Sequence, residues 1–324
     1  MSKTLQRFLM TASVVVASAA VVMACQVPVF RYALERWPAD KYQVIVLSSG
    51  KLDETSQTSL QRLQAAEAEH GANFELATAD VSTIEDDQLL KLWRQHPAKD
   101  TPLMLVLYPQ TAAEVTERVV EAGPLSNASV DRLLQSPVRQ EIAQRLSSGQ
   151  SAVWIFVPSG DAAKDSLALR TLEQRLAANQ QNLSVPTAEV LDIDPLRLQN
   201  NKIPLRIEFS IVTLDRHDPR EAFLLAALTH SEAQLSQAEP QAFPVFGRGR
   251  VLYGLVGRGI MAATIDTACK FMAGPCSCQV KNLNPGVDLL LSFKWDEAVE
   301  GSMISDALPD ESSEPVLLTI PPGR

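Results

Sequence analysis

The 324-residue sequence has few of the residues and motifs that carry chemistry. It holds only four histidines and four cysteines, and the histidines form neither an HExxH motif nor a pair four residues apart. It contains no GKS or GKT, which argues against a P-loop, and no GxSxG nucleophile motif. The net charge of −9 argues against nucleic acid as a partner, because phosphates are bound by lysine and arginine. We therefore predict no cofactor.

The amino terminus is the most informative segment. Lys3 and Arg7 are followed by the uncharged run 8–24 and then by Cys25. This order is typical of a secretory signal peptide, although an uncleaved anchor is the alternative. The letters VMAC, which end at Cys25, also resemble a bacterial lipobox, in which a lipid on Cys25 would associate the protein with a membrane. Either cut predicts an exported protein, located in the periplasm or cell envelope as a soluble protein or a lipoprotein.

Strand-like and helix-like segments alternate along the rest of the chain. Pro28 and the apolar spacing behind it predict a helix directly after Cys25, where lipoproteins usually carry a flexible tether. Short apolar runs predict strands over 42–48, 74–79, 103–108, 117–121, 152–158 and 205–214, and a hairpin over 243–256. Helical periodicity predicts helices over 54–70, 85–95, 130–147, 162–179, 219–230 and 260–272.

This alternation predicts an α/β fold with mixed sheets. We expect a signal peptide over 1–24, an α/β domain over 25–150, and a second α/β domain over 151–295. An acidic, proline-rich tail over 296–324 is expected to be disordered.

The first half resembles thioredoxin-like domains. In that family a redox cysteine begins a helix, and a cis-proline before a central strand faces it. Cys25 precedes the predicted helix, and Thr101-Pro102-Leu103 leads into a strand as the cis-proline segment does. The resemblance implies a thioredoxin-like sandwich, with two such domains in tandem. It does not imply dithiol chemistry in this domain, because Pro28 replaces the second cysteine of CxxC.

Two longer motifs resemble a group of exported bacterial proteins. They are CQVPVFRYALERW, residues 25–37, and GPCSCQVKNLNPGVDLL, residues 274–290. This resemblance spans most of the chain and implies no specific activity.

The second of these motifs contains Cys276 and Cys278, and Cys269 lies seven residues before it. Three hypotheses compete for these thiols. Cys276 and Cys278 could form a strained, easily reduced disulfide for redox catalysis, with Lys281 favouring a thiolate. Cys269, Cys276 and Cys278 could instead bind Cu(I) or Zn²⁺. The third hypothesis is a structural disulfide, which pairs Cys269 with one of the two or Cys25 with another cysteine.

Arg248, Arg250 and Arg258 lie in a glycine-rich segment that has no acidic residue. Backbone amides and guanidinium groups could hold an anion there. The alternative is a tight hairpin with Gly247 and Gly249 at turn positions.

These observations favour an exported cell-envelope protein that binds or scaffolds an unidentified envelope protein and contains structural disulfides. The alternatives are a thiol–disulfide oxidoreductase that uses Cys276 and Cys278, or a module that handles Cu(I) or Zn²⁺ with the same thiols.

Overall fold

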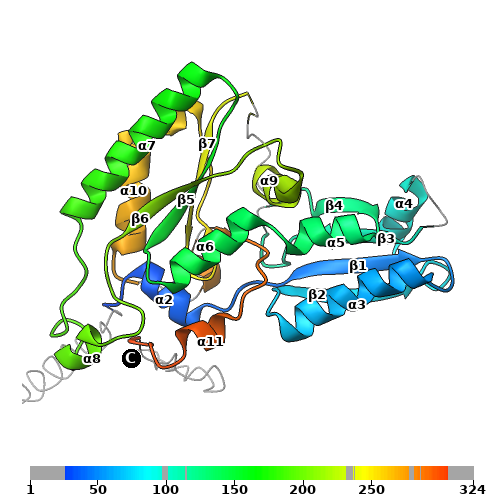
Figure 1. Cartoon of the computed structure of the whole chain (residues 1–324), viewed down its shortest axis with the longest axis horizontal. Coiled ribbons are helices and arrows are strands. Elements are labelled where there is room, and N and C mark those ends of the chain that lie inside the picture. Colours follow the sequence, from blue (N-terminus) through cyan, green and yellow to red (C-terminus); the bar gives the residue numbers. More distant parts are fainter. Residues whose placement is uncertain are drawn as a thin grey trace, which may run out of the picture.

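The computed structural model describes residues 26–305 apart from 97–100, 114, 231–235, 237, 277–280 and 285. These residues form a mixed α/β protein with two mixed β-sheets, one of four strands and one of six (Figure 1). The α/β class expected from the sequence is therefore confirmed. None of the helices in these ranges is long and apolar enough to cross a lipid bilayer.

The four-stranded sheet has the order β2-β1-β3-β4 and lies on the right of Figure 1. Its strands are β1 (Tyr42–Ser48), β2 (Phe74–Asp80), β3 (Leu103–Leu107) and β4 (Val119–Pro124). Its helices are α3 (Glu54–Glu69), α4 (Asp87–Gln95) and α5 (Asn127–Leu134). The apolar residues of α3 and α5 pack on one face of the sheet, and those of α4 pack on the other. We call residues 42–134 the first unit.

The six-stranded sheet has the order β10-β8-β7-β5-β6, and a short β9 pairs with β7. Its strands are β5 (Ala152–Val157), β6 (Phe209–Thr213), β7 (Gln241–Phe246), β8 (Arg250–Val251), β9 (Leu255–Val256) and β10 (Val287–Asp288). The sheet is enclosed on both faces, which is why all six residues of the central β5 are apolar and buried.

Helices cover both faces of this second sheet (Figure 1). One face carries α7 (Ala162–Asn182) and α10 (Ala262–Ala273), and the other carries α6 (Pro137–Ser147), α9 (Ala222–Thr229) and α11 (Trp295–Val299). The smaller elements are α8 (Pro195–Gln199) and the 3₁₀ turns η1 (Pro219–Glu221), η2 (Gly257–Gly259) and η3 (Lys281–Leu283).

The two sheets repeat one topology. In each, the first strand pairs in parallel with the second and antiparallel with the third, which pairs antiparallel with the fourth. An aspartate, Asp53 or Asp161, caps the helix after the first strand. The carbonyl of the proline before the third strand accepts a backbone hydrogen bond in each case, at Pro102 from Leu125 and at Pro240 from Gly257. The letters of the sequence show no such repeat.

The helix predicted directly after Cys25 is present as α2 (Val29–Arg36), but it packs in the core of the second sheet. Helix α6 also packs against the second sheet. We therefore call residues 26–41 and 137–305 the second unit. The predicted domain boundary at 150 separates the two sheets along the chain but not these two helices.

The start of the predicted disordered tail is wrong. Residues 296–305 include most of α11, and Val299 and Ser302 are fully buried. Ser305 donates its backbone N–H to the carboxylate of Glu35 on α2 at 2.8 Å. Residues 306–324 lie outside the described part of the chain.

The single helix predicted over 130–147 is also wrong, because α5 ends at Leu134 and α6 begins at Pro137. Ser136 caps α6 by accepting a hydrogen bond from the Arg139 N–H at 3.0 Å, and Pro137 has no N–H to continue α5. A serine followed by proline therefore outweighs the continuous apolar periodicity.

Candidate functional site

An open groove of about 760 Å³ lies along the amino-terminal turns of α7 in the second unit. Its walls are largely aliphatic, and two of the most exposed large apolar side chains of the protein flank it: Leu167 is 63 % exposed and Met261 is 49 % exposed. Ala168 and Ile260 are buried and form its floor. A volume of this size fits a small molecule or a short peptide segment.

The loop that leads into α7 is held by two aspartates. Asp165 accepts hydrogen bonds from the N–H groups of Ser159 at 2.7 Å and Gly160 at 2.9 Å. Asp161 caps the helix by accepting from the N–H groups of Ala163 and Lys164. These contacts stabilise the first turn of α7 and hold the backbone that presents Leu167 to the groove.

The opposite wall comes from the segments next to β7 and α10. The N–H of Gly257 donates to the carbonyl of Pro240 at 2.8 Å. Gly257 has a φ of +51°, and a Cβ there would lie 3.0 Å from a carboxylate oxygen of Glu239. A glycine is therefore favoured where these two segments meet.

The rim of the groove carries three charged side chains. The Nζ of Lys164 lies 2.5 Å from a carboxylate oxygen of Glu239, which raises the pKa of this lysine. Arg258 is exposed and makes no hydrogen bond or ion pair with any residue that the structure describes. Among the residues that the structure describes, the groove therefore presents one uncompensated positive charge beside an apolar surface.

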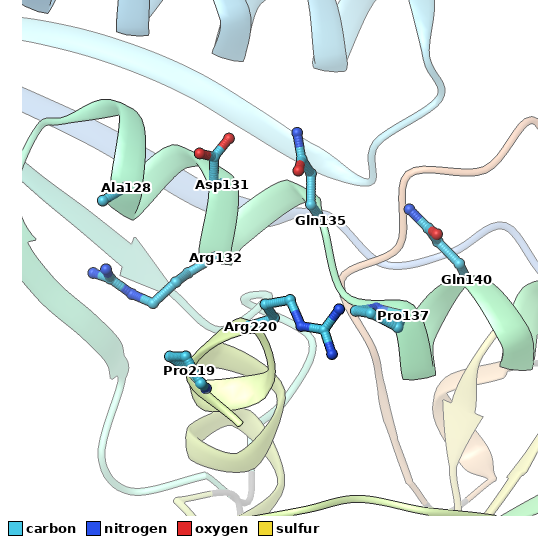
Figure 2. A pocket seen from close by; sticks show the side chains of 8 residues that line it. All are labelled: Ala128, Asp131, Arg132, Gln135, Pro137, Gln140, Pro219 and Arg220. Carbon is cyan, nitrogen blue, oxygen red and sulfur yellow. The ribbon is translucent and has the colours of Figure 1, made fainter. Parts of the chain in front are cut away.

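A second depression, of about 450 Å³, lies where α5, α6 and η1 meet (Figure 2). Its charged side chains already have partners within the chain. Asp131 pairs with Arg62, and Arg132 pairs with Glu121. Arg220, in the middle of the view, pairs with Asp218 at 2.7 Å. Each of these pairs lies within one unit and neutralises the charge that this depression would offer to a ligand, so we take the groove as the candidate site.

The structure describes two of the four cysteines. Cys269 on α10 and Cys276 after it are both buried, and no disulfide joins them. Cys25 and Cys278 lie outside the described residues. Among the described residues, no group of three or more acidic, histidine or cysteine side chains is placed to hold a metal ion.

Burial raises the pKa of the Cys269 thiol to about 12. The folded state thus favours the protonated thiol, and this contribution to stability is complete below the ordinary cysteine pKa and is lost as the pH rises towards 12. We expect iodoacetamide at about pH 8 to leave Cys269 unmodified in the native protein and to modify it in denaturant. Peptide mass spectrometry checks this, and rapid native labelling would contradict the buried position.

The three arginines of the predicted anion site are not equivalent. Arg248 donates to the carbonyl of Leu34 and pairs with Asp296, and buried Arg250 pairs with Asp288 at 3.1 Å. These two groups therefore hold the chain together, and only Arg258 lines the groove. The hairpin alternative is confirmed, since Gly247 and Gly249 have φ values of +58° and +95°. A Cβ on Gly247 would lie 2.6 Å from the Cβ of Ala33.

Lys281 pairs with two carboxylates in the described part of the chain. Its Nζ lies 2.5 Å from Asp288 and 2.8 Å from Asp40. Together with Arg250 these residues form a largely buried cluster of two positive and two negative charges, which joins the end of α2 to β10. Lys281 and Asp288, the charged residues of the sequence motif around Cys276, therefore serve in packing.

Sequence reasoning found Arg258 but missed the aliphatic walls of the groove. Their residues come from segments about 70 to 100 positions apart, so no local pattern marks them. The one sequence feature that could have pointed to this wall is Pro240, which precedes β7 as Pro102 precedes β3.

The fold and groove define a mixed α/β protein with an open apolar cleft. Comparison with protein-family models and with curated proteins finds no match to the chain.

Proposed function

We propose that this chain is an exported, non-catalytic binding component of a bacterial cell envelope, and that its groove receives an extended apolar segment of a partner protein. The observation that carries the proposal is the groove itself, with Leu167 and Met261 exposed along it. Exposed aliphatic surface costs free energy in water, so its concentration along one cleft favours a binding role. Export is inferred from the leader over 1–24.

The proposal includes a thioredoxin-like fold for both units. Support comes from the shared strand order, with a helix after each of the first two strands. A further helix follows the last of these strands, α5 directly after β4 and α10 after the short β9 that comes behind β8. In that family the redox cysteine begins the helix after the first strand. Here the segments that lead into the equivalent helices, residues 49–53 before α3 and residues 158–161 before α7, contain no cysteine, and neither do the first turns of those helices. Without a cysteine these positions cannot exchange disulfides, which favours binding over redox catalysis there.

The alignment of Cys25 with the redox position of the family is wrong. The helix that follows it, α2, precedes the first strand of both sheets and packs in the second unit. The peptide bonds of the described residues are all trans, those before Pro102 and Pro240 included. The cis-proline of the family is therefore absent at both equivalent positions of the described chain.

Cys25 is proposed either to carry a lipid or to take part in a structural disulfide. The described residues that follow Cys25 in the chain support a disulfide to the Cys-Ser-Cys segment, because they lie beside it. Pro28 and Pro275 form an antiparallel bridge, and the N–H of Cys276 donates to the carbonyl of Val27 at 3.0 Å. A disulfide or a lipid at this place would stabilise or anchor the second unit.

The proposed binding role can be tested with a displayed library of short random peptides. We expect the mature protein to select peptides with large aliphatic residues, and Met261→Asp to weaken their binding about tenfold to a hundredfold. The reason is that burying one such side chain contributes about 1.5–3 kcal/mol. Leu196→Asp is the matched control, because Leu196 is likewise exposed, 63 % against 49 % for Met261, but lies on α8, outside the groove. Equal selection by all three proteins would refute the proposal.

A further inference from the structure

The charge on the rim restricts what the groove can bind, if the proposed function holds. Glu239 compensates Lys164, whereas Arg258 has no partner among the described residues. A guanidinium at the edge of an apolar surface forms its strongest contacts with a carboxylate. The best occupant is therefore an extended segment with large aliphatic residues close to an acidic residue.

The chain contains a segment of this kind. Residues 311–320 read ESSEPVLLTI, with Glu311 and Glu314 ahead of an aliphatic run. Pro315 disfavours a helix at this point and restricts Glu314 to extended backbone. The segment is therefore suited to an open groove that is apolar inside and positive at its rim.

The geometry favours a segment from another copy over the chain's own. Ser305, the last described residue, is held against α2 by Glu35. Figure 1 shows α2 and α11 at one end of the second unit, whereas α7 starts at the other end and runs down towards α8. The groove lies on the amino-terminal turns of α7, so it faces away from the end at which the segment emerges.

We propose that the groove binds residues 311–320 of a second copy of this chain. The contact is head-to-tail, because the groove of one copy receives the carboxy-terminal segment of the next. Contacts of this type do not close on themselves unless the rotation between copies forms a ring, so they join copies into rows or rings. The partner in the proposed scaffold role is then a second copy of the same chain.

Sedimentation velocity of the full mature chain, over a range of concentrations, tests the proposal. We expect the wild-type protein to self-associate, and Arg258→Glu or Glu314→Lys each to weaken association on the order of tenfold, because each places like charges together. The double variant should restore association, since it exchanges the two charges. Arg170→Glu is the control, because Arg170 is exposed on α7 but does not line the groove.

Three results would overturn the proposal: a wild-type chain that stays monomeric, association that neither charge reversal changes, or a double variant that is not restored. Docking of the segment into the groove of its own chain would give the first result. If peptide selection still depended on Met261, the binding function would stand and only this occupant would be wrong. If the chain did not self-associate and its peptide selection did not depend on Met261 either, both proposals would fail.

Discussion

Glu35→Gln is expected to destabilise the protein by about 3–5 kcal/mol, as is typical when one partner of a buried ion pair is removed. The side chains of Arg31 and Glu35 are each 1 % exposed, and the arginine Nε lies 2.5 Å from the carboxylate. Glu35 also accepts hydrogen bonds from the N–H groups of Ile304 at 3.0 Å and Ser305 at 2.8 Å. Glutamine has the same shape but leaves Arg31 without its counter-charge and turns an NH₂ donor towards other donors.

Urea denaturation followed by circular dichroism measures this loss. The matched control is Glu173→Gln, an exposed position on α7, which should change stability by less than about 0.5 kcal/mol. Equal midpoints for Glu35→Gln and its control would show that the pair does not hold the end of the chain.

Arg139→Met is expected to lower the free energy of unfolding by a comparable amount, about 3–5 kcal/mol. The two units should then unfold in separate transitions. Arg139 is 4 % exposed, and it donates to the carbonyls of Leu290 at 2.6 Å and Leu133 at 2.7 Å. Its guanidinium lies 5.2 Å from the ring centre of Phe223. Burial lowers its pKa to about 10, so it still carries a charge at neutral pH.

The substitution at Arg139 also affects a buried carboxylate close to it. Buried Glu221 accepts hydrogen bonds from the Ser136 hydroxyl at 2.5 Å and the Val138 N–H at 2.9 Å, and it is a near counter-charge for Arg139. Methionine fills the space but removes a positive charge close to Glu221 and leaves the carbonyls of Leu133 and Leu290 without these donors.

Calorimetry should resolve two transitions for Arg139→Met. The control, Arg170→Met, changes an exposed arginine of α7 and should keep the wild-type profile. A single transition at the wild-type temperature for Arg139→Met would contradict a role for Arg139 in joining the units.

The longer strands could be predicted from the sequence because they contain short apolar runs between polar turns, whereas the two-residue strand β10 was not predicted. β1 matches its predicted bounds, and β5 differs from its prediction by one residue. The partners of α2 could not be predicted, because Arg31 and Glu35 read as an ordinary helical ion pair. Their burial depends on residues 302–305, about 270 positions away along the chain.

The candidate site was predicted only in part for a related reason. Arg258 stood out by its charge among glycines, but Arg248 and Arg250 have the same pattern and are used in packing. The difference lies in Asp288 and Asp296, which only the tertiary fold brings close. The aliphatic walls look like any helix face, since Leu167 and Met261 differ from core residues only by their exposure.

The enclosure of α2 by the last described residues determines the order in which the chain can fold. The strand pairings of the four-stranded sheet all lie within residues 42–124, so they can form while the rest is still being made. The contact of Arg31 with the Ser302 carbonyl spans 271 positions and must wait until nearly the whole chain has emerged. The apolar partners of α2 lie between residues 152 and 276 and at Ile304, so its apolar face also stays uncovered until most of the chain has emerged. A chain with this architecture has its greatest need of a chaperone at its amino-terminal helix, and keeps that need until the segments that enclose the helix are available.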